Sequence, residues 1–180
     1  MISSYTLAVA MCATGGVPVH VYTADSALVD RDAEFVEAVF TTLNDPRGWG
    51  RADVRFCPSN AYDAELEVAL ALPGTVDDLC APIETKGEVS CALDGRAVIN
   101  VKRWDDATRA WSELTDYRNY VINHEVGHLL GLGHAKRCTM TGLAPLMMQQ
   151  SGRRLPCNPN PWPTSFEVAK LEKMNDETDR

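Results

Sequence analysis

The stretch HEVGHLLGLGH, His124–His134, holds three of the chain's four histidines. On a helix, where each residue turns by about 100°, His124 and His128 lie on one face, about 6 Å apart along the axis. Two imidazoles placed in this way can share one zinc ion at the usual Zn–N distance of roughly 2.0–2.1 Å. Glu125 lies about 100° around the helix from His124, which suits a base that acts on water better than a ligand. The stretch therefore predicts a zinc site that does hydrolytic chemistry.

The third histidine is the sharper test of this interpretation. If the helix simply continued, His134 would lie about 15 Å beyond His124 and on another face. The chain must therefore leave the helix after His128. Gly131 can adopt the left-handed conformation that ends helices, and Gly133 adds a second permissive position. We predict that the chain folds back here and that all three histidines bind one ion.

A closed structural zinc site and a metal-free buried cluster are the alternatives. Structural zinc usually has four protein ligands, often cysteines, and Cys138 follows His134 by only four residues. If Cys138 forms a disulfide, it has no thiolate with which to bind zinc. Three histidine ligands leave one position for water, which is the catalytic arrangement.

The same motif resembles the signature of the metzincin metalloproteases, in which three histidines bind zinc above a methionine turn. The resemblance implies that His124, His128 and His134 are the ligands, Glu125 the general base and Gly131 the turning glycine.

The methionine of the turn is expected in APLMMQQ, 144–150. Met147 is the better candidate and Met148 the alternative, although a methionine that merely fills the core is also compatible with the sequence. Some metzincins carry a tyrosine two residues later, where this chain has Gln149, so a mechanism that needs that tyrosine is unsupported. Tyr117 and Tyr120 are expected to pack.

Other segments extend the resemblance. They are DPRGW, the region between Cys80 and Cys91, INVKRW, YRNYVINHEVGH, APLMMQQ and CNPNPWP. Together they resemble a family of predicted secreted bacterial domains of unassigned function with a metzincin-like core, over most of residues 17–163. The resemblance implies an α+β fold with a small mixed sheet, a backing helix, an active-site helix and a Met-turn loop subdomain. It also implies that extended substrate lies along an edge strand, which we expect within Ala97–Lys102.

The function that these features predict is a secreted zinc-dependent endopeptidase acting on a peptide or protein substrate. A non-catalytic zinc-containing binding module is one alternative, and a zinc hydrolase of a non-peptide amide is another. The presence of Glu125, which a purely structural metal does not require, favours catalysis.

Composition limits the remaining possibilities. With 180 residues, 45% of them hydrophobic, the chain is expected to form a single domain over 1–180, and we expect a monomer. The net charge of −8 argues against binding to nucleic acid. No apolar stretch reaches the roughly 20 residues that span a bilayer. The opening YTLAVAMC, 5–12, is expected to be a strand rather than a signal peptide.

Cysteine usage favours an oxidising compartment. Six cysteines occur without a CxxC pair, which is typical of disulfides rather than of a zinc knuckle, although six reduced thiols are the alternative. Proximity in the sequence, and elimination for the last, suggest the pairs Cys80–Cys91, Cys138–Cys157 and Cys12–Cys57. We therefore expect a secreted or extracellular protein, including one held at the cell surface.

The elements that must position the histidines follow from hydrophobic periodicity and turn residues. Strands are expected at 17–23, 52–57 and 65–72, a helix at 30–44, and a hairpin over 88–103 around Asp94-Gly95. The histidine helix should begin near Thr115-Asp116, whose oxygens can cap it. A long structured loop, 139–164, and a short helix, 164–174, should complete the chain.

Overall fold

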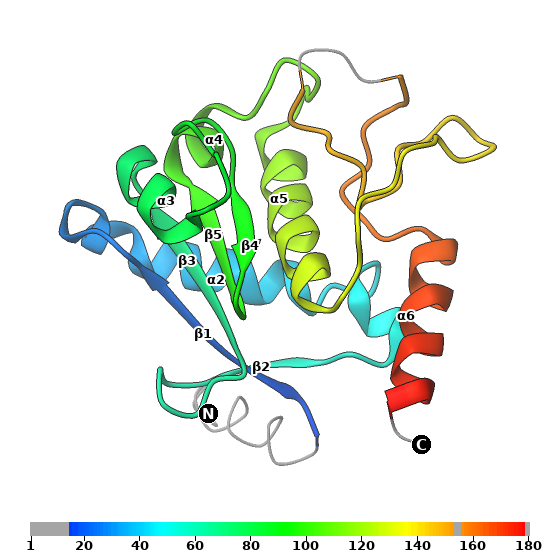
Figure 1. Ribbon diagram of the computed structural model, residues 1–180, viewed down its shortest axis with the longest axis horizontal. Helices are drawn as coiled ribbons and strands as arrows, with labels where there is room; N and C mark the ends of the chain where they lie inside the picture. The colour runs from blue at the N-terminus through cyan, green and yellow to red at the C-terminus, as the bar shows by residue number, and fades with distance from the viewer. Residues whose placement is uncertain (1–14, 153–155, 179–180) are drawn as a thin grey trace, which may run out of the picture.

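A mixed five-stranded sheet forms one side of the molecule in the computed structural model, which describes residues 15–152 and 156–178 (Figure 1). Its strands are β1 Val17–Thr23, β2 Phe56–Pro58, β3 Leu66–Ala71, β4 Cys91–Leu93 and β5 Arg96–Asn100. Their order is β2-β1-β3-β5-β4. All neighbouring strands pair in parallel except β4, which pairs antiparallel with β5.

Helices cover both faces of this sheet. On one face, α2 Asp32–Leu43 and α5 Leu114–Leu129 pack against apolar side chains of β1, β3 and β5. On the other face, α3 Pro73–Cys80 packs against β5. Ile122 of α5 is fully buried in the first of these layers. The helix that carries the histidines is therefore fixed by the core of the sheet.

Shorter helices connect these layers. They are η1 Ser26–Arg31, η2 Trp49–Ala52 and α4 Val101–Asp106, and the chain ends in the longer α6 Ser165–Thr178. α6 contacts η2 and lies on the side of the molecule away from the sheet (Figure 1). None of the helices in the described residues has the length and apolar character needed to cross a membrane.

The first half of the chain matches most of its predicted elements. The strands expected at 17–23 and 65–72 and the helix expected at 30–44 are confirmed to within a few residues. The strand expected over 52–57 is wrong in its first half, because η2 continues to Ala52 and Asp53 adopts a left-handed conformation at φ 58°. α3 was not predicted, because Pro73-Gly74 directly follows the strand expected at 65–72 and these two residue types commonly end a strand. Proline also suits the first turn of a helix, where its missing N–H costs nothing.

The hairpin around Asp94-Gly95 is confirmed, with φ values of 48° and 79° at the two turn residues. Its second strand is shorter than expected. β5 ends at Asn100, whose side chain accepts a hydrogen bond from the Lys102 amide (3.0 Å) and so begins α4. The expectation that Ala97–Lys102 is an edge strand is wrong, because β5 lies between β3 and β4.

The last third of the chain is the long loop that the sequence predicted, followed by α6. The disulfides Cys80–Cys91 and Cys138–Cys157 are both present, as expected. The expected pair Cys12–Cys57 and the expected strand at 5–12 involve residues outside the described part of the chain. The helix expected at 164–174 is confirmed and continues to Thr178.

Candidate metal centre

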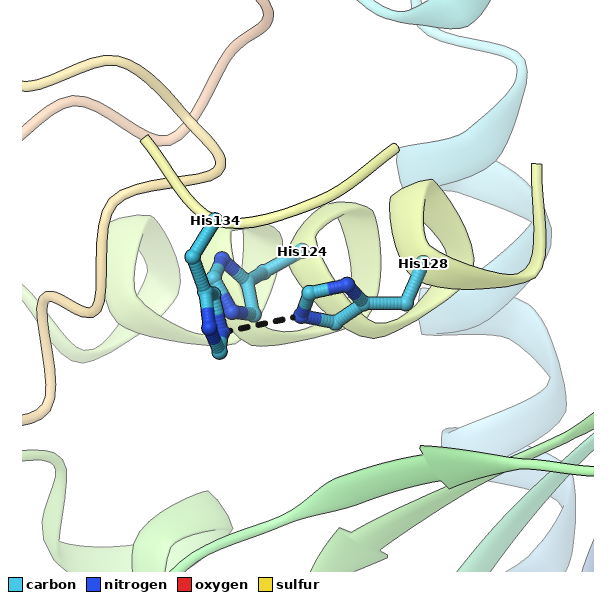
Figure 2. A group of neighbouring side chains, drawn as sticks. All are labelled: His124, His128 and His134. Atoms are coloured by element: carbon cyan, nitrogen blue, oxygen red, sulfur yellow. Dashed lines mark hydrogen bonds between the residues drawn. The ribbon is translucent and has the colours of Figure 1, made fainter. Parts of the chain in front are cut away.

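α5 carries two of the three predicted ligands on adjacent turns. The ring centroids of His124 and His128 are 4.8 Å apart, and Figure 2 shows both rings on the same side of the helix. The helix begins at Leu114, and Glu113 at its N-cap makes no side-chain capping bond. The capping predicted for Thr115-Asp116 is therefore wrong, whereas the helical spacing of the histidines is as predicted.

A tight turn at the end of α5 brings the third histidine back. Gly131 has φ 87°, in the left-handed region that glycine adopts without a steric penalty. Its amide donates to the carbonyl of His128 (3.0 Å), and the next amide, that of Leu132, donates to the carbonyl of Gly127 (3.0 Å). These two bonds form the Schellman motif of helix C-termini. The chain consequently reverses at the predicted glycine, and His134 returns toward the helix (Figure 2).

The three imidazoles converge on one point. Each offers a nitrogen, and these atoms all lie within 4.8 Å of one another. The Nε2 atoms of His128 and His134 are 3.1 Å apart, as the dashed line in Figure 2 marks. Two nitrogens bound to a tetrahedral zinc at the usual distance stand about 3.3–3.4 Å apart. The pair His128–His134 is thus close to the spacing that one ion requires, and the three histidines together can hold a metal.

Hydrogen bonds to backbone carbonyls orient two of the rings. His124 Nδ1 lies 2.8 Å from the carbonyl oxygen of Leu146, and His128 Nδ1 lies 2.9 Å from that of Leu132. Because a carbonyl only accepts, each Nδ1 carries the proton and donates. The lone pair is therefore on Nε2 in both rings, as a metal ligand requires.

Loss of surrounding water favours the neutral form of all three rings, most strongly that of His124. It lowers the pKa of His124 to about 3, and it lowers the pKa values of His128 and His134 as well. Neutral imidazole is the form that binds a metal. The exposure of the three residues increases from His124, which is buried, to His134, which is exposed.

Glu125 lies beside the cluster but does not belong to it. Its side chain is buried, at 7% exposure, and burial raises its pKa to about 8. It lines the same cavity as the three histidines. A carboxyl group in this position is available to exchange a proton with a small molecule in the cavity.

Met147 and Met148 lie in different surroundings. A Cβ added at Gly127 of α5 would lie 2.5 Å from the sulfur of Met147 and 2.9 Å from Trp49. Met147 therefore packs directly under the histidine helix, against a residue that has no side chain. The sulfur of Met148 instead lies 3.6 Å from Sγ of Cys157. Of the two candidates, Met147 is the one whose sulfur packs against α5.

The cavity in front of the histidines has a volume of about 760 Å³. One wall is the segment from Ile83 to Ala92, which includes the start of the edge strand β4 and is closed by the Cys80–Cys91 disulfide. Another part of the wall includes Tyr120, Gln149 and Ser151. The edge strand beside the site is thus β4, not the predicted segment of β5.

The two tyrosines of α5 serve the structure of this wall. The hydroxyl of Tyr120 donates to the carbonyl of Met148 (3.2 Å) and accepts from the amide of Gln150 (2.8 Å). The Tyr117 hydroxyl pairs with that of Ser151 (3.0 Å), and burial raises its pKa to about 12. Both hydroxyls are occupied with the loop, which agrees with the packing role expected for them.

Comparison with known proteins places this geometry in a family. The model of a family described as "Protein of unknown function (DUF3152)" matches residues 17–160. The chain belongs to this family. A search among curated proteins finds no match for it.

Among solved structures, this DUF3152 chain is similar to archaemetzincin from Methanopyrus kandleri. The similarity covers 89% of this chain and 96% of archaemetzincin, with a TM-score of 0.52 and 14% sequence identity. At this identity the similarity concerns the fold, which is the metzincin-like α+β architecture that the sequence resemblance implied.

One residue near the centre was not identified from the sequence. Glu167, in the first turn of α6, is buried at 4% exposure and accepts hydrogen bonds from the amides of Leu146 and Met147 (3.1 and 2.7 Å). A signal was present, because Thr164 and Glu167 have the T-x-x-E spacing of a capping box. Nothing in that spacing points to a segment that lies 20 residues earlier in the chain.

Proposed function

We propose that the protein is an exported zinc-dependent endopeptidase in which His124, His128 and His134 hold the metal and Glu125 is the general base. The observation that carries this proposal is that three converging imidazoles and one carboxyl group open onto a single cavity. A purely structural zinc site needs neither the cavity nor the carboxyl group.

Zinc, if held by His124, His128 and His134, would supply Lewis acidity, which polarises a carbonyl and lowers the pKa of a water molecule toward 7. The carboxyl group of Glu125, which a cation beside it would keep ionised, takes one proton from the attacking water as the oxygen bonds to the scissile carbonyl carbon. Glu125 then gives that proton to the amine nitrogen as the C–N bond breaks, so that the base is regenerated. Tyr120 takes no part, since its hydroxyl is already bonded to the loop backbone.

A peptide is the substrate class that the walls of the cavity favour. Ser90, Cys91 and Ala92 line the cavity at the edge of the sheet. A sheet edge presents backbone donors and acceptors that an extended chain can pair with. Ile83 and Val89, at 44% and 38% exposure, add apolar contacts on the same wall. Export is supported by the two disulfides, which persist in oxidising compartments.

The test is cleavage of a synthetic peptide library, with new termini identified by mass spectrometry. We expect cleavage by the zinc-loaded protein, its loss with a chelator and its return when zinc is added. Glu125→Gln should retain zinc by elemental analysis but lower kcat/KM by about 10²–10⁴-fold, the usual contribution of a general base.

The possible outcomes separate the candidate functions. Zinc binding without cleavage of any peptide would favour the non-catalytic binding module, and cleavage restricted to non-peptide amides would favour the other alternative. Cleavage by Glu125→Gln at the rate of the native protein would exclude Glu125 as the base. A native protein that binds no zinc would remove the proposal altogether.

A further inference from the structure

We propose that Glu167 is a positioning residue for the metal centre, and that its carboxylate fixes the Leu146–Met147 backbone, which in turn holds two of the three histidines. This inference rests on the proposed zinc function. It concerns a residue on α6, an element that contributes no ligand of its own.

The carboxylate of Glu167 holds the segment by both of its amides. Oε2 accepts from the amide of Leu146 (3.1 Å), and Oε1 accepts from the amide of Met147 (2.7 Å). Oε2 also accepts from the amide and the hydroxyl of Thr164 (2.8 and 2.7 Å). Within the described residues, no lysine, arginine or histidine forms an ion pair with Glu167. Its buried charge is therefore compensated by these four donors.

The carbonyls of the same two residues point to the metal centre. The carbonyl oxygen of Leu146 accepts from Nδ1 of His124 (2.8 Å). That of Met147 accepts from the amide of Ala135, the residue directly after His134 (2.9 Å). A peptide segment whose amides are fixed on one side thus presents one carbonyl to the ring of His124 and the other to the backbone beside His134. Partners of this kind set the ring orientation and basicity of a ligating histidine.

His128 provides an internal reference. Its Nδ1 donates to Leu132 within the Schellman turn and does not depend on the Leu146–Met147 segment. A change at Glu167 should consequently affect His124 and His134 and leave the orientation of His128 intact. A general loss of packing would not discriminate between the rings in this way.

Glu167→Gln is the variant that tests the assignment. The amide group has nearly the same shape, but one of its ends is a donor and would face a backbone donor, so one of the two amides loses its partner. Thr164→Ala is the matched control, because it removes a hydroxyl from the same carboxylate and weakens the capping box of α6 without touching Leu146 or Met147. Both variants are expected to lower stability.

The first readout is zinc affinity of the folded, full-length protein, measured by competition with a chromophoric chelator. We expect Glu167→Gln to weaken zinc binding by at least about tenfold. This is the usual loss of metal affinity when the hydrogen-bond partners that orient a ligating histidine are disturbed. Thr164→Ala should bind zinc as the native protein does. If Glu167→Gln does not fold, Glu167→Asp takes its place, since it keeps the charge but is one methylene too short to reach both amides.

The second readout is the ¹⁵N NMR spectrum of the histidine side chains in the zinc-loaded protein. We expect the Nδ1–H signal of His124, which bonds to the Leu146 carbonyl, to shift or broaden in Glu167→Gln while that of His128 is unchanged. Native zinc affinity in Glu167→Gln, or an equal loss in Thr164→Ala, would overturn the positioning role and leave the zinc function standing. Absence of zinc binding by the native protein would instead overturn both proposals.

Discussion

At the scale of single residues, His124 and Glu125 are neighbours that burial affects in opposite ways. It lowers the pKa of the imidazole to about 3 and raises that of the carboxyl to about 8. In both cases the low-polarity surroundings disfavour the charged form. Without a metal, His124 therefore stays neutral in mild acid, where a free imidazole would be protonated, and Glu125 stays protonated up to about pH 8.

The raised pKa of Glu125 predicts a pH-dependent stability for the metal-free protein. The usual pKa of 4.5 applies in the unfolded chain and about 8 in the folded one. The contribution of the protonated carboxyl is complete below pH 4.5 and is lost as the pH rises through 8. Glu125→Gln, which stays neutral, should be more stable than the native chain at pH 9 by an amount on the order of a few kcal/mol.

Denaturant unfolding in the presence of a chelator measures this difference. At pH 4 the two proteins should have similar free energies of unfolding, because the carboxyl is then protonated in both states. A gap that does not change between the two pH values would show that substitution effects other than ionisation dominate.

Gly127 is the second residue with a specific prediction. A methyl group there would overlap the sulfur of Met147 and the ring of Trp49, at 2.5 and 2.9 Å. Gly127→Ala should therefore lower the free energy of unfolding by about 1–3 kcal/mol, the usual cost of overpacking a core, despite the higher helix propensity of alanine. Gly74→Ala in α3, where nothing lies within 4 Å, is the control and should not destabilise. Thermal unfolding of both variants decides the matter.

At the scale of elements, the sequence was most informative where one residue has one physical consequence. The spacing of the histidines on a helix, the reversal at Gly131 and the hairpin at Asp94-Gly95 each follow from local geometry. The errors arose where a residue suits two structures. Pro73 both ends a strand and begins a helix, and Asn100 caps α4 in a stretch whose apolar residues suggested a longer strand.

Contacts between distant segments could not be predicted in the same way. Which strand forms the sheet edge depends on the pairing order of the strands. Because β4 pairs with β5 on its outer side, Ala97 of β5 does not lie at the edge. Likewise, the contact of Glu167 with Leu146 joins two elements whose relative placement only the complete fold determines. Periodicity within one segment contains no information on either.

The loop between α5 and α6 has a prediction of its own. The Cys138–Cys157 disulfide closes 19 residues that include the Met147 turn. Replacing both cysteines by alanine should lower the free energy of unfolding by roughly 3 kcal/mol, the loop-closure entropy regained by the unfolded chain. Urea denaturation of the metal-free protein gives this value. Equal stability of the two forms would mean that the loop is held by its hydrogen bonds alone.

At the scale of the whole molecule, metal binding should be coupled to folding. His124 and His128 are separated from His134 by the helix end, so one ion would tie the turn to α5 only in the folded chain. A zinc concentration of 100 times Kd should then add about 2.7 kcal/mol to the free energy of unfolding. His128→Ala should abolish this gain as well as most bound zinc. A Tm of that variant that still rises with zinc would contradict the ligand assignment.

The expectation of one domain over 1–180 stays a prediction.

The length of β4 has a consequence for self-association. A sheet edge that can accept a peptide is also a template on which another copy of the same protein can add a strand and begin to aggregate. β4 has only three residues, Cys91–Leu93, and so offers too short a run of backbone groups for an intermolecular sheet to grow on it. An extended peptide bound there would gain few main-chain hydrogen bonds, so most of its affinity would have to come from side chains that enter the cavity.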